Sequence, residues 1–292
     1  MAEKKWEGTT FGNSLMHRWL IGILKGIDIR MVYFFTYLFV IPPCLFRSSF
    51  KPIWHYFRKR WGFGPVKAFV KSYQNHCQFA QVVIDKFSMY AGRHFDFEVE
   101  GLEHFEQLTH RPEAFVQLSS HIGNYEVAGY SLRSADKPLN ALVFAGEKQT
   151  VMENRSQMFA DKNVRMIQMK DDMSHLFLID NALQQGEIVS IPGDRVFGSQ
   201  KTVCVNLLGA SAELPMGPFT VAALRGLDVL AVNVMKQDMK TYRIYVTPLC
   251  YDKQAPRKQQ VQQLAEGYAA ELERILHQYP TQWYNYFEFW KS

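Results

Sequence analysis

The chain has few cysteines, and no two of them stand close together. Its 292 residues include four, Cys44, Cys77, Cys204 and Cys250. Without a Cys-x2-Cys pair the sequence suggests neither a zinc site nor a disulfide framework, so a reducing, cytosolic setting is expected. The histidines outside the motif discussed below show no ligand-like spacing, and we therefore expect no metal.

The sequence also lacks a comfortable transmembrane run. Residues 1–13 are polar, so no apolar core follows the first lysines closely enough for a secretory signal. The uncharged stretch 31–46 has 16 residues and contains Pro42-Pro43, whereas a bilayer span needs roughly 20. Two interpretations fit this stretch: a segment that dips into the membrane, and a buried helix of the core. The basic residues 58–60, followed by Trp61, favour an interfacial anchor.

Acidic residues are scarce near the amino end. Residues 1–70 hold 11 Lys and Arg against three acidic residues, a net charge of +8, whereas the whole chain carries +5. Residues 15–29 place apolar side chains at helical spacing with basic ones between them, which is typical of an amphipathic surface helix. Because long apolar stretches surround these charges, an anionic membrane is a better partner for them than nucleic acid.

The remaining composition is that of a folded protein, with 47% hydrophobic and 14% aromatic residues, enough for a substantial core. Residues 66–91 have the pattern of a helix. From His94 onward apolar and acidic residues alternate, which indicates a half-buried strand. We therefore predict two parts, a helical membrane-associating region over 1–92 and an α/β domain over 93–292.

Strands and helices alternate through the second part, which indicates a mixed, largely parallel sheet flanked by helices. The last two strands, 229–235 and 242–248, are predicted to form an antiparallel hairpin, and a long amphipathic helix follows around 261–279. The other predicted strands are 95–99, 114–118, 141–145, 164–169, 188–191 and 203–208, and the predicted helices are 147–160, 173–185 and 217–225. Ligands bind beyond the carboxyl ends of strands in such sheets.

The most informative stretch is Ser119-Ser120-His121-Ile122-Gly123-Asn124-Tyr125-Glu126. It joins the strand 114–118 to a helix that Asn124 would cap. The positive end of the helix dipole disfavours imidazolium, so His121 is expected to be neutral and able to accept a proton. Glu126, in the first turn, could orient the imidazole as the third member of a triad does. An isolated His-x4-Glu is more often a polar loop and a first-turn acid, and the position after a strand strengthens the functional interpretation.

Two further polar clusters follow predicted strands, Glu147-Lys148 and Asp194-Arg195. Each alone could be a solvated loop or a surface ion pair, but three such clusters at one edge of a sheet justify predicting a site. We assign Asp194 and Arg195 to substrate binding, because a guanidinium suits phosphate or carboxylate. An alternative for Arg195 is to assist a developing oxyanion. Glu147, Lys148 and Arg155 are weaker candidates for substrate binding.

These residues resemble the bacterial lipid A biosynthesis (lauroyl/myristoyl) acyltransferases, within the lysophospholipid acyltransferase-like superfamily. The similarity lies in His-Ile-Gly-Asn-Tyr-Glu at 121–126, in Pro-Gly-Asp-Arg at 192–195 with the stretch 209–218, and in the carboxyl end from Pro280. Glu at position 126 is similar to the lipid A branch, whereas glycerolipid acyltransferases usually have Asp there. Their Pro-Glu-Gly-Thr-Arg is also absent, which argues against glycerol-3-phosphate as the acceptor.

The resemblance implies a membrane-associated acyltransferase at the cytoplasmic face of the bacterial inner membrane. The donor would be an acyl thioester on acyl carrier protein or coenzyme A, and the acceptor a hydroxyl, or an amine, of a lipid A-like amphiphile. His121 would act as general base and Glu126 would hold it, without an acyl-enzyme and without a cofactor. Lysophospholipids, aminolipids and pigment or polyene lipids remain alternative acceptors.

Three other classes of protein compete with this interpretation. A thioester hydrolase could use Ser119 or Ser120, but the chain has no Gly-x-Ser-x-Gly elbow and adjacent residues rarely place nucleophile and base correctly. A nucleotide-binding enzyme could use residues 193–202 as a phosphate-binding loop, but Lys201 comes two residues later than the lysine of such a loop. A non-catalytic membrane adaptor explains the basic amino end but not the clusters that follow the strands.

Overall fold

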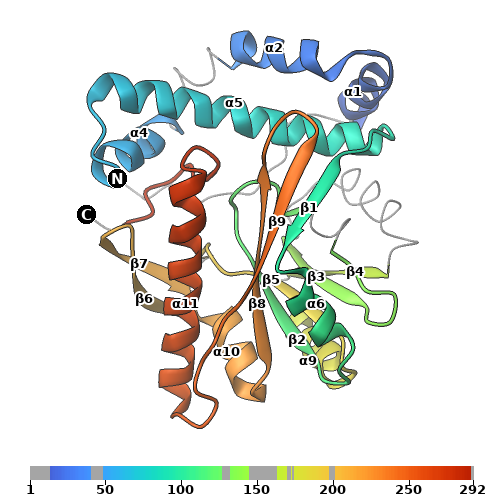
Figure 1. Cartoon of the computed structure of the whole chain (residues 1–292), viewed down its shortest axis with the longest axis vertical. Coiled ribbons are helices and arrows are strands. Elements are labelled where there is room, and N and C mark those ends of the chain that lie inside the picture. The colour runs from blue at the N-terminus through green and yellow to red at the C-terminus, as the bar shows by residue number, and fades with distance from the viewer. Residues whose placement is uncertain are drawn as a thin grey trace.

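A mostly parallel sheet forms the centre of the molecule, as predicted (Figure 1). The computed structural model describes residues 14–40, 49–126, 132–144, 163–169, 172, 174–196 and 201–290. The sheet has seven strands in the order β1-β9-β8-β2-β5-β3-β4. Neighbours are parallel except β8 and β9, which form the predicted hairpin. The strands are β1 (Asp96–Glu100), β2 (Phe115–Ser119), β3 (Leu139–Phe144), β4 (Val164–Met169), β5 (Ile188–Pro192), β8 (Asp228–Lys236) and β9 (Thr241–Pro248).

A separate two-stranded sheet pairs β6 (Thr202–Leu207) with β7 (Ala210–Pro215). The sequence predicted β6 but not β7. Two residues, Leu208 at φ 51° and Gly209 at φ 71°, make the turn between them. Positive φ at both positions is the geometry of a tight hairpin turn, which Asn-Gly or Gly-Gly normally signals. Leucine gives no such signal, so the hairpin was not predicted.

Most of the predicted helices that fall within the described residues are present. The described helices are α1 (Ser14–Gly26), α2 (Ile29–Phe39), α4 (Phe50–Lys59), α5 (Pro65–Tyr90), α6 (Leu102–Thr109), α9 (Ser174–Gln184), α10 (Met216–Arg225) and α11 (Arg257–Gln278). The sequence did not predict α4 or α6, which are short, and α4 contains Pro52 near its start. The predicted helix 147–160 lies outside the described residues.

The helices cover the sheet in two layers. Apolar residues of α4, α9, α10 and α11 share one core with β2, β5 and the β6–β7 hairpin. Residues of α2 and α6 share a second core with the other face of β2, β5, β8 and β9. The long helix α5 crosses the edge of the sheet where β8 ends (Figure 1). The region around this edge brings α2, α5 and the carboxyl ends of the central strands together.

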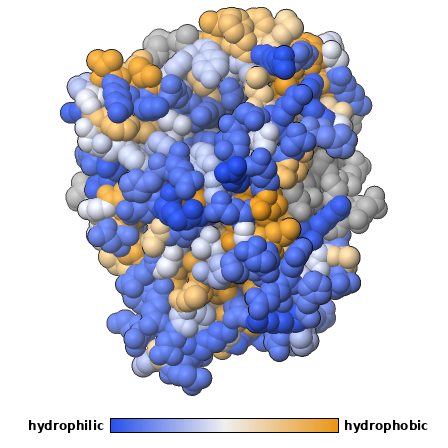
Figure 2. All heavy atoms as spheres, in the orientation of Figure 1, coloured by the Kyte–Doolittle hydropathy of each residue, from blue (hydrophilic) through white to orange (hydrophobic). Residues whose placement is uncertain are grey.

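The amino-terminal helices expose much of their apolar surface. Figure 2 shows apolar side chains gathered over α2 at the top of the molecule. Within α2 only Ile29, Tyr33 and Thr36 are buried. We call the exposed apolar residues of α1, α2 and the turn between them the amino-terminal apolar surface: Trp19, Ile23, Ile27, Met31, Phe34, Phe35, Leu38 and Phe39. Among the described residues, no helix combines the length and the hydropathy that crossing a bilayer requires.

The predicted boundary near residue 92 falls between α5 and β1. Buried residues of α4, such as Phe57, nevertheless belong to the same core as the central strands. The division into 1–92 and 93–292 therefore stays a prediction about domain organisation.

Candidate active site

Strand register brings His121 and Asp194 together. In the parallel pair β2–β5, Ser119 lies opposite Pro192. His121 and Asp194 each follow two residues later, so both extend beyond the same edge of the sheet. The strands β3 and β4 intervene in the sequence but not in the sheet, because β5 inserts between β2 and β3. Two segments 73 residues apart thus supply neighbouring side chains.

Asp194 is held by two contacts with His121. The ring Nδ1 of His121 lies 2.7 Å from Asp194 Oδ1, and the backbone N–H of His121 donates to Oδ2 at 2.8 Å. Asp194 is 1% exposed. Although burial opposes it, the interaction with His121, including its side-chain and backbone hydrogen bonds, and the charge of Arg195 hold the pKa of Asp194 below its usual range. The carboxylate is therefore ionised and acts as an acceptor toward the imidazole.

The imidazole itself is held in the neutral form. Burial lowers the pKa of His121, against the opposing effect of the Asp194 carboxylate. A neutral imidazole that donates from Nδ1 carries its lone pair on Nε2. Nε2 is then available to take a proton, and Asp194 would stabilise the imidazolium that forms, which is the arrangement of a general base and its orienting acid.

The loop that carries His121 is fixed by two other parts of the chain. We call residues 120–124 the His121 loop. Gly123 N–H donates to Gln282 O and Asn124 N–H donates to Val234 O, both at 2.8 Å. Gly123 has φ +56°, and a Cβ there would lie 1.9 Å from Val234 O. The close approach to β8 and the positive φ both require glycine at this position.

The chain near its carboxyl end closes over the same loop. Ile122 forms an isolated antiparallel bridge with Trp283, and Tyr284 N–H donates to His121 O at 3.2 Å. Trp283 and Tyr284 are 2% and 5% exposed. Both side chains therefore pack in the core, and their backbone contacts support the site.

Glu126 has a different partner from the one predicted. Its Oε1 accepts from Lys86 Nζ of α5 at 2.6 Å, and both side chains are about one-seventh exposed. The carboxylate at Nδ1 of His121 is that of Asp194. The orienting role of Glu126 therefore stays a prediction. The contact that this role requires is made by Asp194, which the sequence analysis assigned to substrate binding.

The Arg195 side chain is buried and contacts the chain near its carboxyl end. It is 8% exposed, and its guanidinium donates to Tyr284 O at 2.8 Å. Burial lowers its pKa, against the opposing effect of Asp194. A surface ion pair, the alternative considered for Asp194 and Arg195, does not fit such burial. Arg195 ties the segment after β5 to the chain that closes over His121.

The other predicted positions are less informative. Glu147, Lys148 and Arg155 lie outside the described residues, as do residues 197–200 of the nucleotide-binding alternative. Ser120 is 2% exposed and donates to Asn233 Oδ1 at 2.8 Å, which does not suit a nucleophile. Within the described ranges, no group of three or more His, Cys, Asp or Glu side chains is placed to hold a metal.

Sequence reasoning missed two residues that support the site. Lys86 carried no signal, because a lysine in a helical pattern predicts only a solvated face. Tyr268 lies in the amphipathic helix predicted around 261–279, and its ring packs against Gly193, where a Cβ would lie 3.0 Å from Tyr268 Cζ. Its hydroxyl also donates to Ser119 O at 2.8 Å. This contact depends on how α11 packs on the sheet, which the sequence pattern does not determine.

The comparison with protein families agrees with the resemblance. The family model "Bacterial lipid A biosynthesis acyltransferase" matches residues 74–292. Among solved structures, the chain is similar to the 1-acyl-sn-glycerophosphate (LPA) acyltransferase PlsC from Thermotoga maritima, with 13% identity, a TM-score of 0.40, and coverage of 87% of this chain and 98% of that one. A comparison with curated proteins found no match. The family match spans most of the chain, including all of the residues around His121, and the chain therefore belongs to the bacterial lipid A biosynthesis acyltransferase family and is an acyltransferase.

Proposed function

We propose that the enzyme transfers a fatty acyl chain from an acyl thioester to a hydroxyl, or an amine, of a lipid A-like acceptor at a membrane surface. The observation that carries this proposal is the 2.7 Å contact between His121 Nδ1 and Asp194 Oδ1. It supports a neutral imidazole with Nε2 directed to general-base chemistry. His121 is the proposed base, and Asp194 rather than Glu126 is the proposed orienting acid.

The reaction needs one base and no covalent enzyme intermediate. The acceptor oxygen attacks the thioester carbonyl carbon while its proton passes to His121 Nε2. Asp194 stabilises the resulting imidazolium. The tetrahedral intermediate collapses with cleavage of the carbon–sulfur bond, and the thiolate leaves and takes the proton from His121. General-base help of this kind contributes about 10²–10⁴ in rate.

The amino-terminal apolar surface supports action at a membrane. On α2, Phe34 is 65% and Phe39 73% exposed, and such large exposed apolar side chains favour contact with acyl chains. The net charge of +8 over residues 1–70 favours anionic lipid headgroups. We place the enzyme at the cytoplasmic face of the bacterial inner membrane, held peripherally or by a single segment.

The family supports candidates for the donor and the acceptor. Acyl carrier protein and coenzyme A are both candidate carriers of the acyl thioester, and a lipid A precursor is the first candidate acceptor. Other lysophospholipids, aminolipids and pigment lipids are alternatives. The proposed chemistry requires no cofactor beyond the donor.

Whole-lipid mass spectrometry tests the proposal. Cells would express the wild type, His121→Ala and, as a control, His94→Ala, which removes an exposed imidazole, at equal protein levels. We expect a lipid heavier by one acyl chain with the wild type and His94→Ala but not with His121→Ala, and this species identifies acceptor and chain length together. If the heavier lipid formed equally with the wild type and His121→Ala, His121 would not be the base. If it formed with neither, although donor and acceptors were present, the proposed acceptor class would be wrong.

A further inference from the structure

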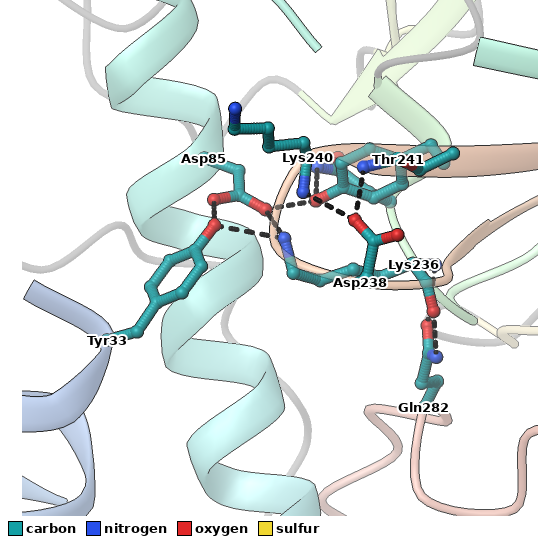
Figure 3. A network of polar contacts seen from close by, with 9 residues as sticks. Tyr33, Asp85, Lys236, Asp238, Lys240, Thr241 and Gln282 are labelled. Carbon is teal, nitrogen blue, oxygen red and sulfur yellow. Dashed lines mark hydrogen bonds and ion pairs between the residues drawn. The ribbon is translucent and has the colours of Figure 1, made fainter. Parts of the chain in front are cut away.

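A buried polar cluster connects the amino-terminal helix α2 to the carboxyl edge of the sheet. Its members are Tyr33 of α2, Asp85 of α5, Lys236 at the end of β8 and Tyr242 of β9; Figure 3 labels the first three of these four. The Asp85 carboxylate accepts from Tyr33, Lys236 and Tyr242, and Lys236 Nζ also donates to Tyr33 Oη at 3.0 Å. Asp85 is 0% exposed and Lys236 8%, so the charges pair with each other.

Stability alone does not account for such a cluster. Taking a carboxylate and an ammonium out of water is costly, and apolar residues of the same volume often serve a core equally well. Buried ionic groups do specify one arrangement of the elements that supply them, because each group needs its partner. Here the arrangement specified is that of α2 and α5 against the ends of β8 and β9.

The cluster reaches the His121 loop by two routes. The Tyr242 hydroxyl accepts from Asn124 Nδ2 at 3.3 Å. The backbone of Lys236 exchanges two hydrogen bonds with the Gln282 side chain, at 3.0 and 2.8 Å, and Gln282 O accepts from Gly123 N–H at 2.8 Å. Both routes end within three residues of His121.

The same cluster reaches the amino-terminal apolar surface through Tyr33. On α2, Tyr33 is 4% exposed, while the next two residues, Phe34 and Phe35, are 65% and 43% exposed. Since the buried side of α2 is limited to three residues, the Tyr33 hydroxyl supplies the polar attachment of this helix to the cluster. A change in the position of α2 would therefore alter the hydrogen bond between Tyr33 and Asp85.

We propose that Tyr33, Asp85, Lys236 and Tyr242 are positioning residues for the reaction, and that they align the His121 loop when α2 is seated on an anionic lipid surface. The inference rests on the proposed function for the identity of the reaction and of the surface. Lipid is the occupant that the charge of residues 1–70 and the exposed apolar side chains favour. Binding of α2 to lipid would restrict the motion of Tyr33. The hydrogen bonds of the two routes would then restrict the motion of residues 123 and 124.

Hydrogen exchange of the full-length enzyme tests this coupling without relying on catalysis. Peptides covering residues 115–126 would be followed with and without vesicles of phosphatidylglycerol and phosphatidylethanolamine. The variant is Tyr33→Phe, and the matched control is Tyr37→Phe, which removes a hydroxyl from an exposed side chain of the same helix. We expect vesicles to slow exchange several-fold in the wild type and in Tyr37→Phe, and to leave it unchanged in vesicle-bound Tyr33→Phe.

Two results would overturn the proposal: equal protection of the loop in Tyr33→Phe and the wild type, and vesicle binding by the wild type without any change in the loop.

A second variant, Tyr242→Phe, removes the contact with Asn124. We expect it to exchange faster at 115–126 in both states and to lose kcat several-fold at unchanged KM. A folded Tyr242→Phe with unaltered exchange would contradict the route through Asn124. If transfer did not depend on His121, the proposed function would be wrong. The coupling would still be tested, because hydrogen exchange does not require catalysis.

Discussion

Asp194 accepts both the ring Nδ1–H and the backbone N–H of His121, at 2.7 and 2.8 Å. One carboxylate therefore sets the tautomer of the base and the path of the loop that carries it. Because Asp194 follows β5 and His121 follows β2, rigid neighbouring strands hold the pair. This is the geometry that a general base needs before substrate arrives.

The first prediction concerns the carboxylate that orients His121. Replacing Asp194 with Asn keeps the shape but offers an amide to Nδ1, which no longer favours the Nδ1–H tautomer or stabilises imidazolium. We expect Asp194→Asn to lower kcat by about 10²–10⁴, with a far smaller change in KM. Steady-state kinetics on purified enzyme, with folding checked by circular dichroism, measures this.

Glu126→Gln is the matched comparison, since it makes the same isosteric change at the carboxylate that Lys86 contacts. We expect it to retain more activity than Asp194→Asn. If Glu126→Gln lost as much kcat and Asp194→Asn stayed near the wild type, the orienting role would return to Glu126, as the sequence predicted.

The second prediction concerns pH. Burial lowers the pKa of His121 from 6.5, so kcat/KM should rise with pH through a midpoint below 6.5 and then level off. Because the pKa is lower in the folded than in the unfolded state, the associated stability is present above pH 6.5 and lost as pH falls through the folded pKa. Asp194 opposes the shift, so Asp194→Asn should move the midpoint further toward acid. A midpoint above 6.5 in the wild type would contradict a buried neutral base.

The sequence predicted the two halves of the site but not their pairing. The pattern placed His121 and Asp194 after strands, at the edge where ligands bind. It could not predict that β5 lies beside β2, because strand order depends on packing and two other strands come between them in the sequence. Glu126, close in sequence, was therefore chosen as the partner, and its contact with Lys86 depends on where α5 crosses the sheet.

Other parts of the fold were predicted where local patterns determine them. The β8–β9 hairpin and the strand β4 were predicted from short apolar runs, and both are present. The strand β7 was missed because Leu208 gives no turn signal. The closing contacts of Trp283 and Tyr284 were missed because they are made by backbone groups, about which side-chain patterns say little.

The third prediction concerns the turn within the His121 loop. In Gly123→Ala the new Cβ would meet Val234 O, and φ +56° is unfavourable for alanine. Gly209→Ala is the control, because Gly209 has φ +71° with open space around it. We expect Gly209→Ala to cost about 1–2 kcal/mol of unfolding free energy, from backbone strain alone. Gly123→Ala should cost more and lower kcat by roughly 10², because His121 is displaced.

Denaturant unfolding and kinetics on both variants separate the two effects. Equal losses of stability would mean that the loop relaxes away from β8. Full activity in a folded Gly123→Ala enzyme would show that the close approach to Val234 is not needed for catalysis.

The fourth prediction decides between two roles of Arg195. The sequence assigned it to substrate binding, whereas the residue is 8% exposed and its guanidinium donates to Tyr284 O. Arg195→Lys keeps the charge but loses the planar fork that reaches more than one acceptor. If Arg195 mainly holds the closing chain against the segment after β5, the variant should be less stable by about 1–3 kcal/mol, with kcat reduced and KM little changed. A rise in KM at wild-type stability would instead support direct contact with an anionic group of the substrate.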